Sequence, residues 1–529
     1  MIKKGRQVDL VRYCLVSLAV GIVCALLYLS NAPKVITRAN FGGDGGDFLA
    51  AALTGGIPHP TGYPTYTLLA GWFQKLPFGE PYWKGVLLSL LPACLSAALL
   101  AGLISLEIGR KKGSGMEKAR WRQAAALGGV TGLAWGVSPL LWSQAVIVEV
   151  HGLQALLICA VLGWAALLLR VDWRQQSKRS IRWLLLGCAL IAGLGMGNHV
   201  TLTLALPAVI TAGWVAFRRG LGWRWLLAQI GAFVLGLSVY LYLPLSARSY
   251  PPINWGNPQT WEGFRWLVTA EAYQRFVLGG DLKLWIQRLA AWAGLLAKQY
   301  GAFGVFLGAF GLFQGALYPR ALNLVFAWVF AAYSLFAMAY STVDSTLYLL
   351  PAFLVFAAWV GAGLAQVVGW RWKSLPLGWL AAAIFLLLIV ARIPATWREV
   401  DPRRDSATAA YCEGVLASLP QGALLFTYSE GDTFPLWFYH FGLQRRTDLR
   451  IVVSPLTQFA WYRETLFHTY PDLRKPEEEY QGLTSQAHPP GWTPWTAGLA
   501  YVNSNRVICW SPASFADGSL PEPQCGSQP

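Results

Sequence analysis

The sequence predicts an all-α polytopic membrane protein with a small α/β domain at its C-terminal end. Two observations predict this fold class. First, 55% of the 529 residues are hydrophobic and only 13% are charged, whereas a soluble domain carries about 25% charged residues. Second, the apolar residues come in long blocks, such as 84–106, 225–245 and 376–394. A helix needs about 20 such residues to cross roughly 30 Å of hydrocarbon.

Apolar length and flanking charge predict about eleven transmembrane helices within residues 1–396. The first span has a long apolar stretch and no clear small-residue cleavage site after it, so we expect an uncleaved span rather than a signal peptide. The predicted spans are 11–30, 84–106, 123–139, 150–169, 183–198, 200–217, 225–244, 299–317, 322–340, 346–367 and 376–394.

Basic residues predict the orientation of these spans in the cell membrane. They gather in alternate loops, which therefore share the cytoplasmic side. An odd number of spans then places the N-terminus in the cytoplasm and the C-terminal domain outside it. The net charge of +16 reflects this bias. Nucleic acid is not an expected partner, because it would need basic residues on one folded face. The basic residues include Lys3, Lys4, Arg6, Arg110, Lys111, Lys112, Lys118, Arg120, Arg122, Arg174, Lys178, Arg179, Arg182, Arg218, Arg219, Arg224, Arg320, Arg371 and Lys373.

The opposite loops differ in kind, because several are rich in Gly, Pro, Trp and His and contain few cations. Two of them, 31–83 and 245–298, are long and too aromatic to be free linkers. Within them, segments 63–76 and 258–276 are predicted to be helices that lie along the membrane interface with their aromatic side down. The shorter outer loops are 139–149, 197–200 and 341–346.

The composition changes at about residue 397, which predicts an extracytoplasmic domain over 397–529. The segments GALLFTY and DLRIVV are typical of short buried strands, and TFPLWFYHFGL and TQFAWYRETLFH of amphipathic helices. About the last twenty residues are rich in Pro, Gly and Ser, and we expect them to be disordered. A disulfide between Cys509 and Cys525 is possible if the domain lies outside the cell, and with no CxxC motif zinc is not suggested.

The first long outer loop contains the most distinctive motif, FGGDGGDFLAAA over residues 41–52. Asp44 and Asp47 are three residues apart, so a helix that starts near Asp44 presents both carboxylates on one face of its first turn. One interpretation is structural, with Asp44 as the helix cap and Asp47 complementing the helix dipole. The other is functional, because a carboxylate at a membrane surface can deprotonate a hydroxyl. The glycines around Asp44 would allow φ > 0 and a close approach of substrate.

Further polar and ionisable residues lie at the outer ends of spans. Each alone has a structural explanation, since a histidine can cap a span and an arginine can snorkel. Collected on one side of the membrane, they indicate a functional site. Arg and His can hold a phosphate, and Trp and Tyr suit sugar rings. Together they fit the transfer of a sugar from a lipid-linked phosphate to an acceptor hydroxyl. These residues are Glu149, His151, Asn198, His199, Arg248, Asn254, Trp255, Asp344 and Tyr348.

The segment GGDGGDFLAAALTGGIPHPTGYPTYTLL resembles the signature of a bacterial membrane family of unknown function that is related to the plexin-type transmembrane protein O-mannosyltransferases. The similarity continues in family order through VEVHGL, GNHVT, YLPLSARSYPPINWGNPQTWEGF and DSTLYLLP, so it covers about residues 10–360. In the tail, GALLFTYSEGDTFPLWF and RRTDLRIVV are similar less strongly.

The resemblance implies a GT-C fold and the transfer of a sugar, with inversion, from a polyprenyl-phosphate carrier on the non-cytoplasmic side. It implies that Asp44 is the catalytic base with Asp47 beside it, and it adds His59 and Tyr63 of the HPTGYP motif to the expected substrate-binding residues. Two positions depart from the signature: Asp47 stands in place of a Glu, and Thr61 in place of the second Pro of HPPGYP. The sugar (mannose or another hexose) and the acceptor (a protein or an envelope glycan) do not follow from the resemblance.

Two other functions remain as alternatives. A transporter or flippase of a lipid-linked glycan should show half-matching repeats and ionisable residues near mid-membrane, and the sequence shows neither. A non-catalytic envelope scaffold or sensor would explain the outer domain but not the set Asp44, His199 and Arg248. No cofactor is expected, because Arg and His can neutralise a lipid monophosphate. Asp44, Asp47 and Glu149 could share a divalent ion only if they meet in space.

Overall fold

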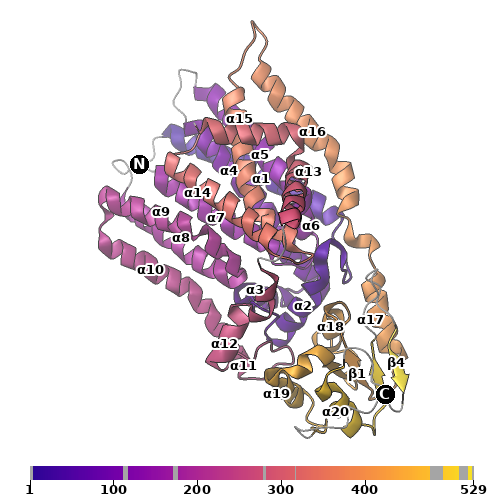
Figure 1. Ribbon diagram of the computed structural model, residues 1–529. Helices are drawn as coiled ribbons and strands as arrows, with labels where there is room; N and C mark the ends of the chain where they lie inside the picture. The colour runs from indigo at the N-terminus through magenta and orange to yellow at the C-terminus, as the bar shows by residue number, and fades with distance from the viewer. Residues whose placement is uncertain are drawn as a thin grey trace.

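The computed structural model describes residues 4–110, 117–170, 177–277, 282–315, 317–476, 492–511 and 522–526. Most of these residues are helical, and the long helices form a bundle with a smaller domain at one end (Figure 1). The long helix α16 (Leu377–Glu399) runs along the bundle and leads into that domain.

The helices confirm the predicted multi-pass membrane fold. In the described ranges, ten helices are long and apolar enough to cross a membrane, or eleven if a pair bent by 64° ahead of Pro139 is one span. Each predicted span corresponds to helix in the structure. The elements are α1 (Lys4–Ser30), α4 (Pro81–Arg110), α5 (Glu117–Gly136) with α6 (Pro139–Ala145), α7 (His151–Arg170), α8 (Lys178–Asn198), η2 (Val200–Ala205) with α9 (Leu206–Ala216) and η3 (Phe217–Leu221), α10 (Trp223–Leu237) with η4 (Ser238–Leu241) and α11 (Tyr242–Ala247), α13 (Leu282–Gln314), α14 (Arg320–Ala339), η6 (Ser345–Leu349) with α15 (Leu350–Val367), and α16.

Helix α13 differs from the prediction of a loop up to residue 298 and a span from 299. It begins at Leu282, and its backbone breaks at Gly301, where φ is 69°, a value that glycine adopts without steric cost. Before the break, the Arg288 guanidinium donates to the Met338 carbonyl and to the Ser341 hydroxyl, at 2.7 Å each, at the C-terminal end of α14. Residues 282–298 are therefore helix packed on the bundle.

The two long outer loops contain short helices. They match the helices predicted at 63–76 and 258–276, and the exposed Trp72 and Trp261 are of the kind that anchors interfacial helices. Their position in a bilayer stays a prediction. The elements are η1 (Ala39–Asp44), α2 (Gly45–Thr54), α3 (Pro64–Gln74), α12 (Trp261–Val268) and η5 (Glu271–Phe276).

The C-terminal domain is α/β, as predicted. Its sheet has the order β2-β1-β3-β4, with β1 parallel to both of its neighbours and β4 antiparallel to β3. A disulfide joins Cys509 to Cys525 across the last pair. Strand β4 contradicts the expectation of disorder for this part of the C-terminal end, whose other residues largely lie outside the described ranges. The elements are η7 (Pro402–Arg404), α17 (Ala407–Ser418), β1 (Leu424–Thr427), α18 (Glu430–Trp437), η8 (Phe438–Gly442), β2 (Arg450–Val453), η9 (Ser454–Gln458), α19 (Ala460–Thr469), α20 (Pro494–Val502), β3 (Ile508–Trp510) and β4 (Gln524–Gly526).

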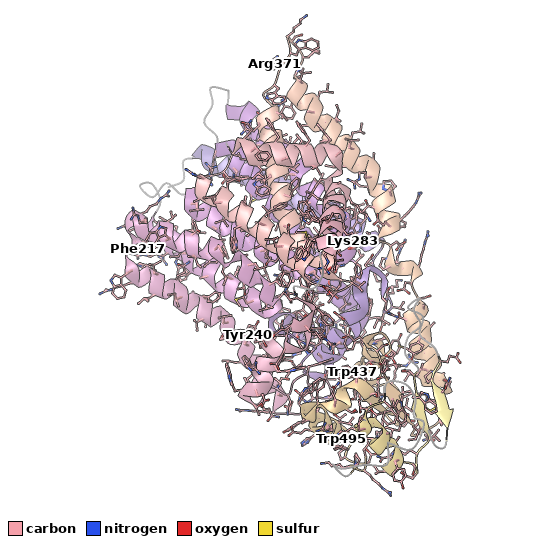
Figure 2. The ribbon with its side chains drawn as sticks, viewed as in Figure 1. Phe217, Tyr240, Lys283, Arg371, Trp437 and Trp495 are labelled. Atoms are coloured by element: carbon pink, nitrogen blue, oxygen red, sulfur yellow. A yellow bond between two sulfur atoms is a disulfide. The ribbon has the colours of Figure 1, made fainter. Side chains whose placement is uncertain are left out.

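One hydrophobic core joins the C-terminal domain to the first outer loop. Phe48 of α2 is buried in the same cluster as Trp437 of α18, and a second core lies between the spanning helices. Because apolar burial stabilises the contact, the domain is held on α2. Figure 2 shows Trp437 near this junction, and it shows Arg371 and Trp495 at opposite ends of the molecule. The basic loop between α15 and α16 thus lies far from the C-terminal domain, as the predicted orientation requires.

Candidate active site

Asp47 is a fully buried carboxylate that two other segments hold in place. The backbone N–H and the imidazole Nδ1 of His59 each lie 2.8 Å from Asp47 Oδ2. The indole N–H of Trp255 donates to Asp47 Oδ1 at 3.2 Å. Asp47 itself stands in the first turn of α2 and is 0% exposed. The first turn of α2, the loop that follows it and the second long outer loop therefore meet at this carboxylate.

Asp44 has a different environment. It occupies the N-cap position of α2, but its side chain accepts no hydrogen bond from the helix, so the interpretation of Asp44 as a side-chain cap is wrong. Its side chain is 34% exposed, and Oδ2 lies 3.5 Å from His59 Nε2. His59 thus stands between the two carboxylates, with Nδ1 toward Asp47 and Nε2 toward Asp44. A partly exposed carboxylate that caps no helix is available to accept a proton from a substrate.

The glycines around Asp44 provide close packing and not the expected positive φ. The positive values occur just before them, at Asn40 (58°) and Phe41 (65°). At Gly46, a Cβ would lie 2.8 Å from the Pro435 nitrogen of the C-terminal domain, closer than real Cβ contacts come. The expectation that these glycines supply φ > 0 is therefore wrong. Gly46 allows a close approach of protein backbone, and the expected close approach of substrate stays a prediction.

The turn before Asp44 is fixed by the linker between α16 and the C-terminal domain. Asp405 Oδ2 accepts hydrogen bonds from the Thr37 hydroxyl (2.6 Å) and from the next two backbone N–H groups (2.9 Å each). The Asn40 amide donates to the Val400 carbonyl at 2.8 Å. Left-handed non-glycine residues cost about 1–3 kcal/mol each and persist only where the surroundings over-determine them. The linker therefore helps to hold the strained turn that aims Asp44.

A row of rings continues from His59. The ring centroids are 5.1 Å apart for His59 and Tyr63, 5.8 Å for Tyr63 and His199, 5.8 Å for His199 and His151, and 5.5 Å for His199 and Tyr348. The residues come from the loop before α3, the break between α8 and η2, the first residue of α7, and η6. The structure thus brings together five of the residues that the sequence predicted for one site.

Two further predicted carboxylates lie near the site. Glu149 is buried, its Oε2 accepts a hydrogen bond from the Val150 N–H at 3.1 Å, and burial raises its pKa. Asp344 is half-buried and acts electrostatically on Asp44 and Glu149. Within the described ranges, no three His, Cys, Asp or Glu side chains are placed to hold a metal ion. The expectation that the protein uses no cofactor stays a prediction.

Three predicted residues lie outside the row of rings. Asn198 donates to the Gln154 side chain at 3.1 Å, inside the bundle. Asn254 donates to the Thr465 hydroxyl of α19 at 3.2 Å and so ties the second long loop to the C-terminal domain. Arg248 follows α11 with an exposed side chain. Its assignment to the phosphate stays a prediction.

The Asp44–His59 pair has shifted proton affinities. Burial raises the pKa of Asp44 to about 7, although the neighbouring His59 lowers it. Burial by itself lowers the pKa of His59, but Asp44 and Asp47 raise it, and the result is about 9. A general base works best when its pKa lies near the operating pH. The pair can therefore hold a carboxylate base beside a protonated imidazole at pH values between these two.

The C-terminal domain contributes residues that sequence analysis did not select. Glu430, the first residue of α18, acts electrostatically on His59 and Asp47, and the Tyr273 hydroxyl lies 3.5 Å from Glu430 Oε1. The Phe434 ring stacks on His59 at 5.9 Å. The segment GALLFTYSEGDTFPLWF, which contains both tail residues, resembles the same family. That signal could have been followed, but the sequence does not show that this segment packs on the first loop.

Known proteins match the chain over the regions that build this site. The family model described as "Protein O-mannosyl-transferase TMEM260 N-terminal domain" matches residues 44–220, and the model described as "TMEM260-associated domain 2" matches residues 408–471. The mouse Protein O-mannosyl-transferase TMEM260 is 26% identical over 506 residues, which cover 88% of this chain and 66% of the mouse protein. The Dictyostelium discoideum protein of the same name is 21% identical, with 88% and 60% covered. The chain thus spans less than two thirds of the length of these curated relatives.

Solved structures show the fold. ArnT from Cupriavidus metallidurans bound to undecaprenyl phosphate is similar with a TM-score of 0.54 and 15% identity, covering 94% of this chain and 93% of ArnT. The apo form of ArnT gives a TM-score of 0.57 and 14% identity, covering 94% and 92%. As its motifs predict, the chain is similar to the protein O-mannosyl-transferases TMEM260 over residues 44–220 and 408–471, and it has a GT-C fold.

Proposed function

We propose that this chain is a membrane glycosyltransferase that moves a sugar from a polyprenyl-phosphate carrier to an acceptor hydroxyl on a protein or an envelope glycan. Mannose is the sugar in the name of the curated relatives, and undecaprenyl phosphate is the lipid bound to one structural neighbour. The observation that carries the proposal is the position of Asp44. It is a partly exposed carboxylate 3.5 Å from His59, and the row of rings begins at that histidine.

In the proposed reaction Asp44 is the general base. Its carboxylate takes the proton from the acceptor hydroxyl while the hydroxyl oxygen forms a bond to the anomeric carbon of the sugar. The bond from that carbon to the phosphate oxygen breaks, and the electron pair leaves with the phosphate on the carrier. Attack opposite the leaving phosphate inverts the anomeric centre. Asp47 is buried and holds His59, so its part is to position the imidazole beside Asp44.

The donor is assigned to the side of the site that the rings form. The sugar ring would rest on the aromatic faces of Tyr63 and Tyr348, and His199 and Arg248 would take the phosphate. The site lies at the end of the bundle that carries the C-terminal domain, opposite the basic loop with Arg371 (Figure 2). This placement fits a lipid-linked donor used on the non-cytoplasmic side.

The test compares Asp44→Asn with the wild type in transfer from polyprenyl-phosphate mannose. The substitution keeps the size of the side chain and removes the base, which contributes about 10²–10⁴ in rate. Transfer should fall by at least about 10², while Glu413→Gln, an exposed carboxylate paired with Arg445, should behave as the wild type. A wild-type rate for Asp44→Asn would remove Asp44 as the base.

The same assay separates the enzyme from a transporter of lipid-linked glycan. A glycosyltransferase releases the free polyprenyl phosphate and attaches the sugar to the acceptor. A transporter moves the intact lipid-linked glycan and leaves the bond between sugar and phosphate unbroken. Failure of the wild type to consume any polyprenyl-phosphate sugar would reject the proposed donor class.

A further inference from the structure

The C-terminal domain touches the chain on both sides of the candidate base. Two residues after Asp44, Gly46 packs so closely on α18 that an added Cβ would lie 2.8 Å from the Pro435 nitrogen. On α18 itself, an added Cβ at Gly431 would lie 3.0 Å from the guanidinium carbon of Arg38, just before the strained turn. Backbone meets backbone at the first contact, so α18 and the start of α2 can move only together.

This docking places the side chain of Glu430 beside the catalytic pair. Glu430 is exposed, and its Oε1 lies 3.5 Å from the hydroxyl of Tyr273 in η5. The carboxylate therefore stands between the C-terminal domain and the second long outer loop, with access to solvent. The ionisable groups that interact electrostatically with Glu430 or with Asp44 include His59, Asp47, Asp344, Glu149, Tyr63, Tyr273, Tyr340 and Tyr348.

We propose that the docked C-terminal domain completes the active site by holding Glu430 as a positioning residue next to the Asp44–His59 pair. The proposal rests on the proposed function, since it assigns Glu430 a part in the same transfer. Glu430 acts through charge. A negative charge nearby makes it harder for a carboxylic acid to lose its proton, and it stabilises a protonated imidazole. Both effects have the same sign, so Glu430 raises the pKa of Asp44 and that of His59.

Glu430→Gln tests this role because it keeps the shape of the side chain and removes its charge. In the full chain, both limbs of the pH profile of transfer should move to lower pH, by about half a unit or more. The matched control is Glu413→Gln, in the same domain, whose profile should superimpose on that of the wild type. A role limited to folding would lower the rate without moving the limbs. A Glu430→Gln profile that superimposes on the wild type would overturn the proposal.

A second readout needs no transfer and so separates this inference from the proposed function. The chain has six histidines, and isotope-labelled histidine in the purified full chain gives a titration for each, with His59 assigned by its absence in His59→Gln. The pKa of His59 should be lower in Glu430→Gln than in the wild type. An unchanged His59 titration would refute the proposal even if transfer is observed. A shifted titration with no transfer by the wild type would reject the function and keep the electrostatic role.

Two glycine variants test the docking. Gly46→Ala forces α18 away from α2, whereas Gly43→Ala adds a methyl group where nothing lies within 4 Å. Gly43 and Gly46 both lie within two residues of Asp44, so the two variants are a matched pair. They differ in that only Gly46 contacts the C-terminal domain. Gly46→Ala should move the limbs of the pH profile in the same direction as Glu430→Gln, and Gly43→Ala should not. A wild-type profile for Gly46→Ala would show that docking does not set the position of Glu430.

Discussion

Replacing Asp47 by Asn tests whether this carboxylate supports His59 or reacts itself. Its two oxygens have different partners: Oδ2 accepts from the His59 backbone N–H at 2.8 Å, and Oδ1 from the Trp255 indole N–H at 3.2 Å. An amide has only one acceptor oxygen, so its NH₂ group must face one of these donors. A buried donor left unsatisfied costs about 1–3 kcal/mol. Losing the charged partner of the His59 ring adds to that, so we expect destabilisation of about 2–4 kcal/mol.

The comparison with Asp44→Asn strengthens the test, because the two variants should lose different properties. Asp44→Asn should lose transfer, and Asp47→Asn should lose stability. Asp44 is partly exposed with one contact at 3.5 Å, so its replacement should change stability by less than about 1 kcal/mol while transfer is lost. Asp47→Asn should unfold at a clearly lower temperature, followed by tryptophan fluorescence in detergent, yet keep more transfer than Asp44→Asn where both are folded. Equal unfolding temperatures for Asp47→Asn and the wild type would refute the support role. Transfer abolished only in Asp47→Asn would make Asp47 the base.

Three other measurements address protonation, the donor and orientation. Transfer should rise with pH as Asp44 loses its proton near 7 and fall as His59 loses its proton near 9; a rate that is already full at pH 5 contradicts Asp44 as the base. Arg248→Ala should weaken binding of a polyprenyl phosphate by about 0.2–1 kcal/mol, the range for an exposed ion pair, and unchanged binding would remove Arg248 from the site. A reporter active only outside the cytoplasm, fused after residue 420, should be active; activity confined to a fusion in loop 110–122 would reverse the orientation.

The sequence alone determined those properties that depend on residues close together along the chain. The length of an apolar block decides whether a helix can cross a membrane, and all eleven predicted spans are helical. In the C-terminal domain, short local patterns predicted β1, β2, α18 with η8, and α19, but not α17, α20, β3 or β4. The prediction for α13 was wrong because its charged and aromatic start is typical of a loop, whereas contacts to α14 hold it as helix ahead of the break at Gly301.

The candidate site has features that local sequence patterns did not predict. The sequence placed His59, Tyr63, His151, His199 and Tyr348 in one candidate site, and their rings do meet. It gave no way to tell which of two carboxylates three residues apart is buried and which faces the site. That difference depends on contacts between distant segments.

Tertiary structure decided the environments of the two carboxylates. Trp255, which holds Asp47, is 208 residues away from it, and Asp405, which holds the turn before Asp44, is 368 residues from Thr37. Likewise, Glu430 reaches the site only because the C-terminal domain docks on α2. Side-chain burial and charge are set by whichever segments pack together, and hydrophobic periodicity along the chain carries no information about such pairings.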